Sequence, residues 1–260
     1  SGCSTNACLA GRKLGLPKVG FVGCIGHECE THFRQEMVRY GIELPRLKVV
    51  SETGGFKLVY DKGGNRTLDV LGISGRILPE DIPEECFDSR VILLGPILGE
   101  IDLELIRFVR DRSKAEVFLD PQGMVREVGP SGRVREVGNF EASKLYSSLV
   151  DIIKPNEHEA RAMTGVEDPF FSVRMMTEWG AKVSIVTLAE RGSIIARRRS
   201  LLRIDAYETF AKDPTGAGDT YAGAFITKYL ENWPLLECGL FASAAASIKV
   251  EYTGPDFPLT

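Results

Sequence analysis

The residues best suited to chemistry lie in one run, DPTGAGDT at residues 213–220, which directly precedes an apolar stretch with helical spacing. Glycines at a helix start let backbone N–H groups approach an anion, and the helix dipole adds partial positive charge there. The chemistry that this arrangement suits is phosphoryl transfer. Asp219 would accept the proton of the attacking hydroxyl, and the N–H groups of residues 216–218 would stabilise the charge on the moving group. The same run also fits a glycine-rich turn capped by Thr215, with Asp219 complementing the dipole.

A second polar run, KPNEHE at residues 154–159, follows a short apolar stretch. Asn156 and Glu159 have the spacing of a capping box, in which each side chain binds the backbone N–H of the other residue. Alone, this run indicates the start of a helix. At its distance before residues 213–220, it indicates a functional site as well.

The two runs together resemble the signature of the ribokinase-like (PfkB-type) carbohydrate kinases, whose patterns are D-T-x-G-A-G-D and K-P-N-x-x-E. Here a proline, Pro214, replaces the usual threonine. The resemblance implies an ATP-dependent kinase with Asp219 as the base. The anion hole would be formed by the backbone N–H groups of Gly216, Ala217 and Gly218.

The same resemblance implies the cofactors ATP and Mg²⁺. Asn156 would organise the nucleotide phosphates, and Glu159 would hold Mg²⁺ through water, which suits an ion that keeps most of its waters. Members of the family often use a monovalent cation such as K⁺ beside the anion hole. The resemblance implies that Asp213 would be the side-chain neighbour of this cation.

Other segments resemble the same family along the whole chain. Residues 187–192 resemble the turn that borders the nucleotide, and residues 241–247 resemble the small-residue helix over the adenine. Residues 1–6 resemble the glycine-rich loop that binds the acceptor. The residues expected at the nucleotide are therefore Asn156, Thr187, Gly192, Thr215 and Ser243, and those expected at the acceptor include Gly2 and Asn6. Because family members begin one strand earlier, we expect a first strand before Ser1.

The fold does not determine the acceptor, since the family phosphorylates sugars, sugar phosphates, nucleosides and cyclitols. Residues 94–101 and 119–126 resemble the subgroup that includes myo-inositol kinases, which makes Gln122 and Arg126 candidates for contacting the acceptor. The alternative is a loop glutamine and a solvated arginine. Phe56 and Tyr60 could stack on a base, which leaves a nucleoside kinase open.

The elements that must position these residues alternate along the chain. Apolar runs predict strands at residues 18–24, 91–94, 116–120, 150–154 and 182–187, and helical patterns occur at residues 28–40, 102–112, 156–164, 169–179, 217–230 and 235–250. This alternation predicts one three-layer α/β/α domain over residues 1–260 with a mainly parallel central sheet. Two hairpins interrupt it. One spans residues 125–138, and the other, at residues 53–71, resembles the family's β-lid over the acceptor.

Composition limits the remaining possibilities. The 260 residues are 43% hydrophobic and 26% charged, which is enough for a core and excludes a disordered chain. The net charge of −4 disfavours a nucleic-acid partner, and no apolar run is long enough to cross a membrane. The six scattered cysteines predict reduced thiols in a cytoplasmic protein. A lid hairpin with one apolar face could pair with a second copy, which makes a homodimer plausible.

Two other interpretations fit parts of the sequence. Cys24, His27, Cys29 and His32 offer zinc-type ligands, but ligands so close together on one segment rarely complete a tetrahedron. A non-catalytic sugar or nucleotide sensor would share the fold. Such a sensor has no need of the Asp219 carboxylate, which favours the enzyme.

Overall fold

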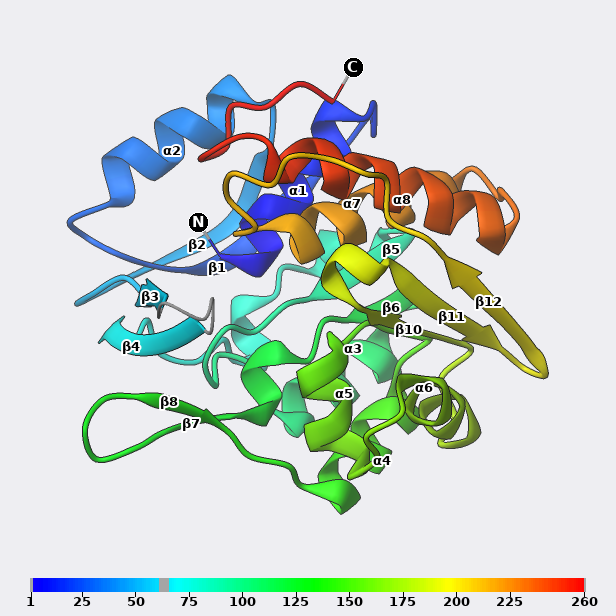
Figure 1. Cartoon of the computed structure of the whole chain (residues 1–260). Helices are drawn as coiled ribbons and strands as arrows, with labels where there is room; N and C mark the ends of the chain where they lie inside the picture. The colour runs from blue at the N-terminus through cyan, green and yellow to red at the C-terminus, as the bar shows by residue number, and fades with distance from the viewer. Residues whose placement is uncertain (1, 61–65, 260) are drawn as a thin grey trace.

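Helices lie on both sides of a central sheet (Figure 1). The computed structural model describes residues 2–60 and 66–259. Its helices are α1 (Cys3–Lys13), α2 (Glu30–Arg39), α3 (Leu103–Arg112), α4 (Phe140–Leu149), α5 (Glu157–Thr164), α6 (Pro169–Glu178), α7 (Ala217–Leu230) and α8 (Leu235–Val250). Short 3-10 helices lie at Pro79–Asp81, Glu84–Asp88, Gln122–Val125 and Ala189–Arg191.

The central sheet has six strands in the order β12-β11-β10-β9-β6-β5. They are β5 (Val91–Leu94), β6 (Glu116–Leu119), β9 (Ile152–Ile153), β10 (Val183–Thr187), β11 (Ser193–Arg197) and β12 (Ser200–Ile204). The four strands from β5 to β10 pair in parallel, and β11 and β12 pair antiparallel. The predicted α/β fold with a mainly parallel sheet is therefore confirmed.

Each face of this sheet has its own core. Helices α1, α7 and α8 cover one face, where Phe118 and Ile152 of the sheet pack against Phe225. Helices α3, α4, α5 and α6 cover the other face, where Ile153 packs in one cluster with Met176. Because strands covered on both faces place apolar side chains on each side, they read as continuous apolar runs in the sequence.

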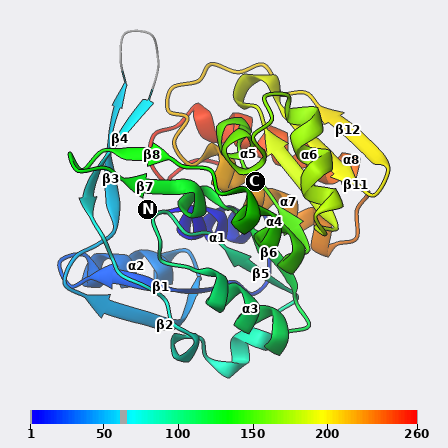
Figure 2. The same cartoon turned by 90° about the horizontal axis from the view of Figure 1, so that it is seen from below.

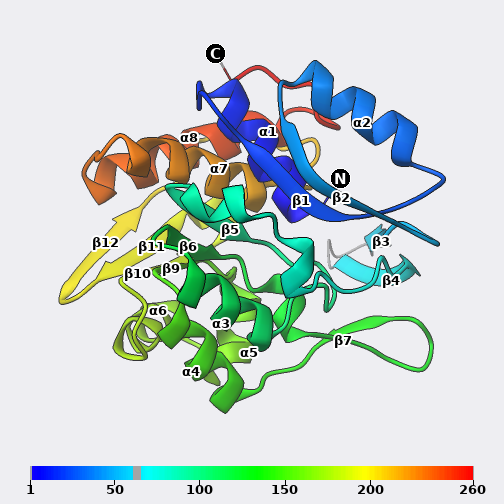
Figure 3. The ribbon, with the colours of Figure 1, turned by 180° about the vertical axis from the view of Figure 1, so that it is seen from behind.

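A second, separate sheet is formed by β1 (Gly20–Gly26) and β2 (Glu43–Val50), which pair in parallel beside α2. A cavity of about 940 Å³ separates β1 from β5 and is lined by residues of both strands, including Val22, Ile25, Ile92 and Leu94. Figure 3 shows β1 and β5 on the same side of the molecule, near α1. The expectation of a further strand before Ser1 stays a prediction.

The two predicted hairpins are present and lie side by side (Figure 2). The lid consists of β3 (Gly55–Tyr60) and β4 (Arg66–Gly72), and the other hairpin consists of β7 (Arg126–Val128) and β8 (Val134–Glu136). The N–H of Val70 donates to the carbonyl of Gly132 at 2.9 Å, and Arg133 pairs with Asp69 at 3.2 Å. The lid turn at residues 61–65 and the side chain of Tyr60 lie outside the described residues, and dimerisation through the lid stays a prediction.

Candidate active site

Polar residues meet at the carboxyl ends of two neighbouring strands. Asp120 follows β6, Lys154 follows β9, and Asp219 lies in the first turn of α7. In open α/β sheets, ligands bind at this edge, where the strands end and helices begin. The sheet order therefore brings together residues that lie far apart in the sequence.

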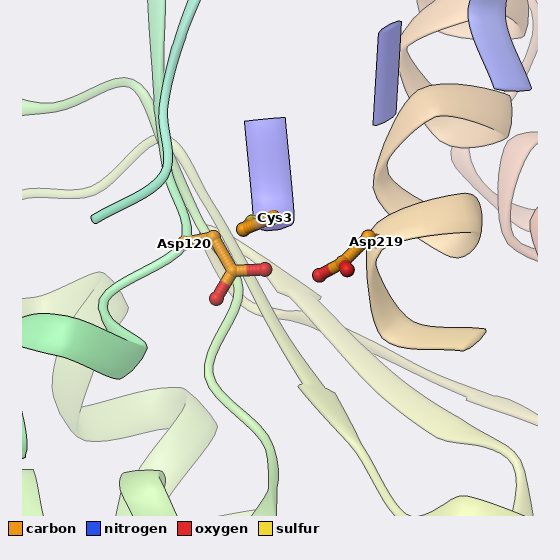
Figure 4. A group of neighbouring side chains, drawn as sticks. All are labelled: Cys3, Asp120 and Asp219. Atoms are coloured by element: carbon orange, nitrogen blue, oxygen red, sulfur yellow. The ribbon is translucent and has the colours of Figure 1, made fainter. Parts of the chain in front are cut away.

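Asp219 lies at the centre of this group. Its Oδ2 accepts a hydrogen bond of 2.8 Å from Nδ2 of Asn6, which reaches the site from the start of α1. Single ligand atoms of Cys3, Asp120 and Asp219 lie within 4.8 Å of one another, and Figure 4 shows these side chains converging from three elements. Burial, followed by the Asp120 charge, raises the pKa of Asp219, while the Asn6 hydrogen bond acts in the opposite direction. A carboxylate with a raised pKa is suited to accept a proton.

A buried ion pair lies beside this carboxylate. Nζ of Lys154 is 2.8 Å from Oδ2 of Asp120, and the two side chains are 3% and 2% exposed. Burial alone would lower the pKa of Lys154, but the Asp120 charge outweighs it and holds this pKa above its usual value. A Cβ placed on Gly218 would lie 3.6 Å from this Nζ, so the ammonium lies against the start of α7.

The loop before α7 has the close backbone approach that an anion site requires. Gly216 has φ +82°, and a Cβ there would lie 3.0 Å from Nδ2 of Asn6, so the position favours glycine twice over. One of the N–H groups predicted to bind the anion, that of Ala217, instead donates to the carbonyl of Pro214 at 3.2 Å. Among the described residues, the N–H groups of Gly216 and Gly218 have no such acceptor. They remain available to an anion, whereas the N–H of Ala217 would first have to break its hydrogen bond to Pro214.

The expected capping box at α5 is present, with Glu159 buried and Asn156 half-buried. The N–H of Asn156 donates to Oε2 of Glu159 at 2.9 Å, and the N–H of Glu159 donates to Oδ1 of Asn156 at the same distance. Arg126 lies 3.7 Å from Oε1 of Glu159, and both side chains are at most 5% exposed. Burial is the main reason that the pKa of Glu159 rises to about 7.

This oxygen-only arrangement fits Mg²⁺ held through water. Both oxygens of Glu159 already face protein N–H groups, from Asn156 and Arg126. Glu159 can therefore orient a metal-bound water more readily than it can bind the ion directly, and Mg²⁺ usually keeps several waters. The residues present thus suit the role that the sequence predicts for them.

The raised pKa of Glu159 has a consequence for stability. The folded state holds the Glu159 proton more tightly than the unfolded chain does, so this proton adds to the free energy of unfolding. That contribution is fully present below pH about 4.5 and is lost as the pH rises through about 7. Glu159→Gln should lack this decline, so urea denaturation should show the variant gaining on the parent protein between these two pH values. Glu157→Gln, on the same helix turn, is the control and should follow the parent. Parallel curves for Glu159→Gln and the parent would contradict the assignment.

A monovalent cation fits less well beside Asp213. Oδ1 of Asp213 accepts the N–H of the exposed Thr215 at 3.0 Å, so part of this carboxylate closes a local turn. The neighbourhood also contains a lysine ammonium, that of Lys249, which is buried against Gly216. A second cation at this place would meet like charge.

The residues predicted to border the nucleotide form a separate group around the ends of β10, β11 and β12. Thr187 forms a parallel bridge with Asn156, which joins this group to the capping box. Gly192 has φ +85°, and a Cβ there would lie 2.0 Å from the carbonyl oxygen of Ile204. Ser243 is buried and its hydroxyl donates to the carbonyl of Asp205 at 3.0 Å.

The residues predicted for the acceptor gather around the loop after β5. Nη1 of Arg126 donates to the carbonyl of Ile97 at 3.1 Å, and Ile97 also lies against Gly2. Half-buried Gln122 precedes Gly123, whose N–H donates to Pro96. The alternative of a solvated Arg126 is wrong, because its side chain is 5% exposed and its guanidinium lies 5.6 Å from the centre of the Phe56 ring. The lid and Glu159 enclose it.

Sequence reasoning missed part of the site. Cys3, Asp120 and Lys154 were not predicted as site residues, although Asp120 and Lys154 each directly follow a buried strand, which was a usable signal. Residues 3–6 are helical rather than a loop, because they form the first turn of α1 after Gly2. The ligand atoms of Cys24, His27, Cys29 and His32 do not form a metal-sized group; among the described residues the one such group is Cys3, Asp120 and Asp219.

Comparisons with known proteins show which family and which relatives this chain is similar to. Residues 133–260 match the family model described as "pfkB family carbohydrate kinase". The chain is 29% identical to the cytidine kinase of Thermococcus kodakarensis, over 92% of this chain and 81% of that one. It is 27% identical to the ribokinase of Haemophilus influenzae, over 97% of this chain and 81% of that one.

A solved structure shares the fold. It is a pyrophosphate-dependent kinase in the ribokinase family, complexed with a pyrophosphate analogue and myo-inositol. Its TM-score is 0.86 at 21% identity, and the match covers 98% of this chain and 88% of that one. Within residues 2–60 and 66–259, no helix is both long and apolar enough to cross a membrane.

Proposed function

The chain belongs to the ribokinase-like (pfkB) family of kinases, and on that premise we propose that it transfers the γ-phosphoryl group of ATP to a hydroxyl of a sugar or cyclitol. The observation that carries this proposal is the half-buried Asp219 in the first turn of α7, beside Asn6 and the Lys154–Asp120 pair. A binding protein would gain nothing from a carboxylate with a raised pKa at the point where the anion loop begins a helix.

The proposed reaction is a single displacement. The acceptor oxygen forms a bond to the γ-phosphorus while the bond from that phosphorus to the β,γ-bridging oxygen breaks, and ADP leaves. The acceptor proton passes to an oxygen of Asp219, which Asn6 holds in place. The N–H groups of Gly216 and Gly218, together with the charge of Lys154, stabilise the negative charge on the moving group.

Mg²⁺, when bound, would screen the donor phosphates and keep them aligned for transfer. Asn156 and Glu159 are the residues that would hold it through water. The nucleotide would lie along Thr187, Gly192, Thr215 and Ser243. A cytoplasmic location and a homodimer formed through the lid belong to the same proposal.

The acceptor that we favour is a cyclitol similar to myo-inositol. The site offers Gln122 and the buried Arg126, whose Nε has no hydrogen-bond partner among the described residues. A buried N–H without an acceptor is costly, so a bound hydroxyl would complete it. The structural neighbour complexed with myo-inositol has the same fold, which is compatible with such an acceptor.

A nucleoside acceptor is the second candidate. The cytidine kinase of T. kodakarensis is 29% identical to this chain. In addition, the ring of the lid residue Phe56 lies against the guanidinium of Arg126, one of the residues proposed for the acceptor. An aromatic ring at the lid could cover a base as well as a cyclitol ring. The two candidates therefore differ in what lies beneath the lid, and they share the transfer chemistry.

The test is turnover with Mg²⁺ across a panel of acceptors: myo-inositol, ribose, fructose, fructose phosphates, adenosine and cytidine. Each is offered ATP and, separately, pyrophosphate. We expect ATP-dependent turnover, fastest with myo-inositol. Turnover confined to adenosine or cytidine would favour the nucleoside kinase. Turnover with pyrophosphate alone would overturn ATP as donor, and none on any acceptor would overturn the enzyme proposal in favour of a sensor.

A further inference from the structure

A lysine lies buried behind the anion loop, on the last turn of α8. Lys249 is 4% exposed, and its Nζ donates a hydrogen bond of 2.9 Å to the carbonyl of Tyr252. The ring of Phe257 lies 5.5 Å from this Nζ. An ammonium has three hydrogens to donate, so one carbonyl leaves most of its capacity unused.

Within the described part of the chain, this buried charge has no carboxylate beside it. Among the described residues, no Asp or Glu oxygen lies within 4.0 Å of the Lys249 ammonium, whereas the equally buried Lys154 has Asp120 at 2.8 Å. Burial lowers the pKa of Lys249, and only the more distant charges of Asp213 and Asp219 oppose this effect. Buried charges are normally paired, because removing an ion from water is expensive. The arrangement is therefore one that an incoming anion would complete.

The anion loop lies against the side chain of Lys249. A Cβ placed on Gly216 would lie 3.7 Å from Cε of Lys249 and 3.0 Å from Nδ2 of Asn6. Both Asn6, the partner of Asp219, and the end of the Lys249 side chain therefore lie beside this glycine. The N–H groups of Lys212 and Asp213 both donate to the carbonyl of Val250, which fastens the loop to the end of α8.

We propose that the Lys249 ammonium is the built-in cation of the anion loop, so that phosphoryl transfer needs no added K⁺. This inference rests on the proposed function for the reaction that it serves. Lys249 acts through the loop, as a positioning residue whose charge favours an anion held by Gly216 and Gly218. It replaces the monovalent cation that the sequence alone predicts beside Asp213.

The first test is turnover of the parent protein at constant ionic strength in KCl, NaCl and tetramethylammonium chloride. We expect the same kcat within about twofold in all three salts, because the positive charge beside the loop belongs to the Lys249 side chain. Lys249→Met keeps the volume and removes the charge, and should lower kcat by about 10²-fold, as removal of one stabilising donor does. Lys249→Ala leaves room for a cation, so K⁺ or methylammonium should restore much of the activity of this variant. The same cations should not restore the activity of Lys249→Met, because the methionine side chain fills the space.

The matched control is Lys13→Met. Lys13 also holds the C-terminal segment, with its Nζ donating to the carbonyls of Pro255 and Phe257 at 2.7 and 2.8 Å, but it does not adjoin the loop. This variant should keep the parent's kcat. Its thermal melt shows what loosening the segment does by itself.

Three results would overturn the proposal: a parent that requires K⁺, a fully active Lys249→Met, or a Lys249→Ala that no cation restores. A second measurement needs no turnover, so it separates this proposal from the proposed function. Calorimetric binding of ATP should be independent of K⁺ for the parent and should become K⁺-dependent for Lys249→Ala. ATP binding that responds to K⁺ in the parent would overturn the inference even if no acceptor were ever found.

Discussion

Asp219→Asn is expected to lower kcat by about 10²–10⁴-fold, the usual contribution of a positioned general base. The amide keeps the shape of the side chain and can still bind Asn6, so the fold and the substrate KM should change little. What is lost is the ability to take the acceptor's proton. Steady-state kinetics and a thermal melt on the same preparation measure the two effects separately.

The control for this substitution is Asp168→Asn. Asp168 also stands at the start of a helix, where it caps α6 through the N–H of Phe170, but it is exposed and away from the site. It should retain the parent's kcat. Loss of activity in both variants would show that the change acts through helix stability rather than through proton transfer.

Asn6→Ala tests the assignment of Asp219 as the general base through the pH dependence of the rate. The Asn6 hydrogen bond holds the pKa of Asp219 down, so its removal should raise that pKa further. The acid limb of the pH–rate profile should then move to higher pH, because more of Asp219 is protonated at a given pH. An unmoved acid limb would mean that another group limits the rate at low pH.

Lys154→Met is expected to destabilise the protein by about 3–5 kcal/mol, because it leaves the Asp120 carboxylate buried without its partner. This is a large fraction of the stability of an ordinary domain. Urea denaturation measures it directly. Lys154→Met combined with Asp120→Asn should recover much of the loss, since the second change removes the unpaired charge.

Lys182→Met supplies the matched control. Lys182 lies 2.8 Å from Asp151, the same distance as in the buried pair, but its side chain is 55% exposed. Asp151 also keeps Arg110 at 2.7 Å. This loss should be no more than about 1 kcal/mol. Equal losses in the two lysine variants would show that burial of the Lys154–Asp120 pair does not set its energy.

The elements with strong local signals were predictable from sequence. Both α7 and α8 begin and end at the predicted residues, because Gly216 and Pro234 mark their starts and their interiors are apolar. Helix α1 was missed, since its buried residues other than Leu9 are small. Its packing on α7 is visible only in space, where a Cβ on Gly223 would lie 2.4 Å from the carbonyl oxygen of Ala7. Strand β2 was also missed, and it contains Pro45, which strands tolerate mainly at sheet edges.

The candidate site was predictable where one segment contains all the residues proposed for one role. Asp219 and the Asn156–Glu159 box each lie within a short run whose spacing has physical meaning. The pairing of Lys154 with Asp120 depends on β6 lying next to β9, which is a property of the sheet order. Burial of Arg126 depends on the lid residue Phe56, and that of Lys249 depends on where α8 ends against the loop. Contacts of this kind arise from tertiary packing, which no local pattern displays.

The cavity between β1 and β5 bears on how the molecule unfolds. The β1–β2 sheet has a small cluster of its own, built on Leu9, Met37 and Ile42, and no described backbone hydrogen bond joins it to the six-stranded sheet. Cooperative units are set by such boundaries, and weakly joined parts can open locally while the rest stays folded. Helix α1, which carries Cys3 and Asn6, packs against both parts. The cooperativity of unfolding would therefore report whether the part that carries Cys3 and Asn6 unfolds together with the six-stranded sheet.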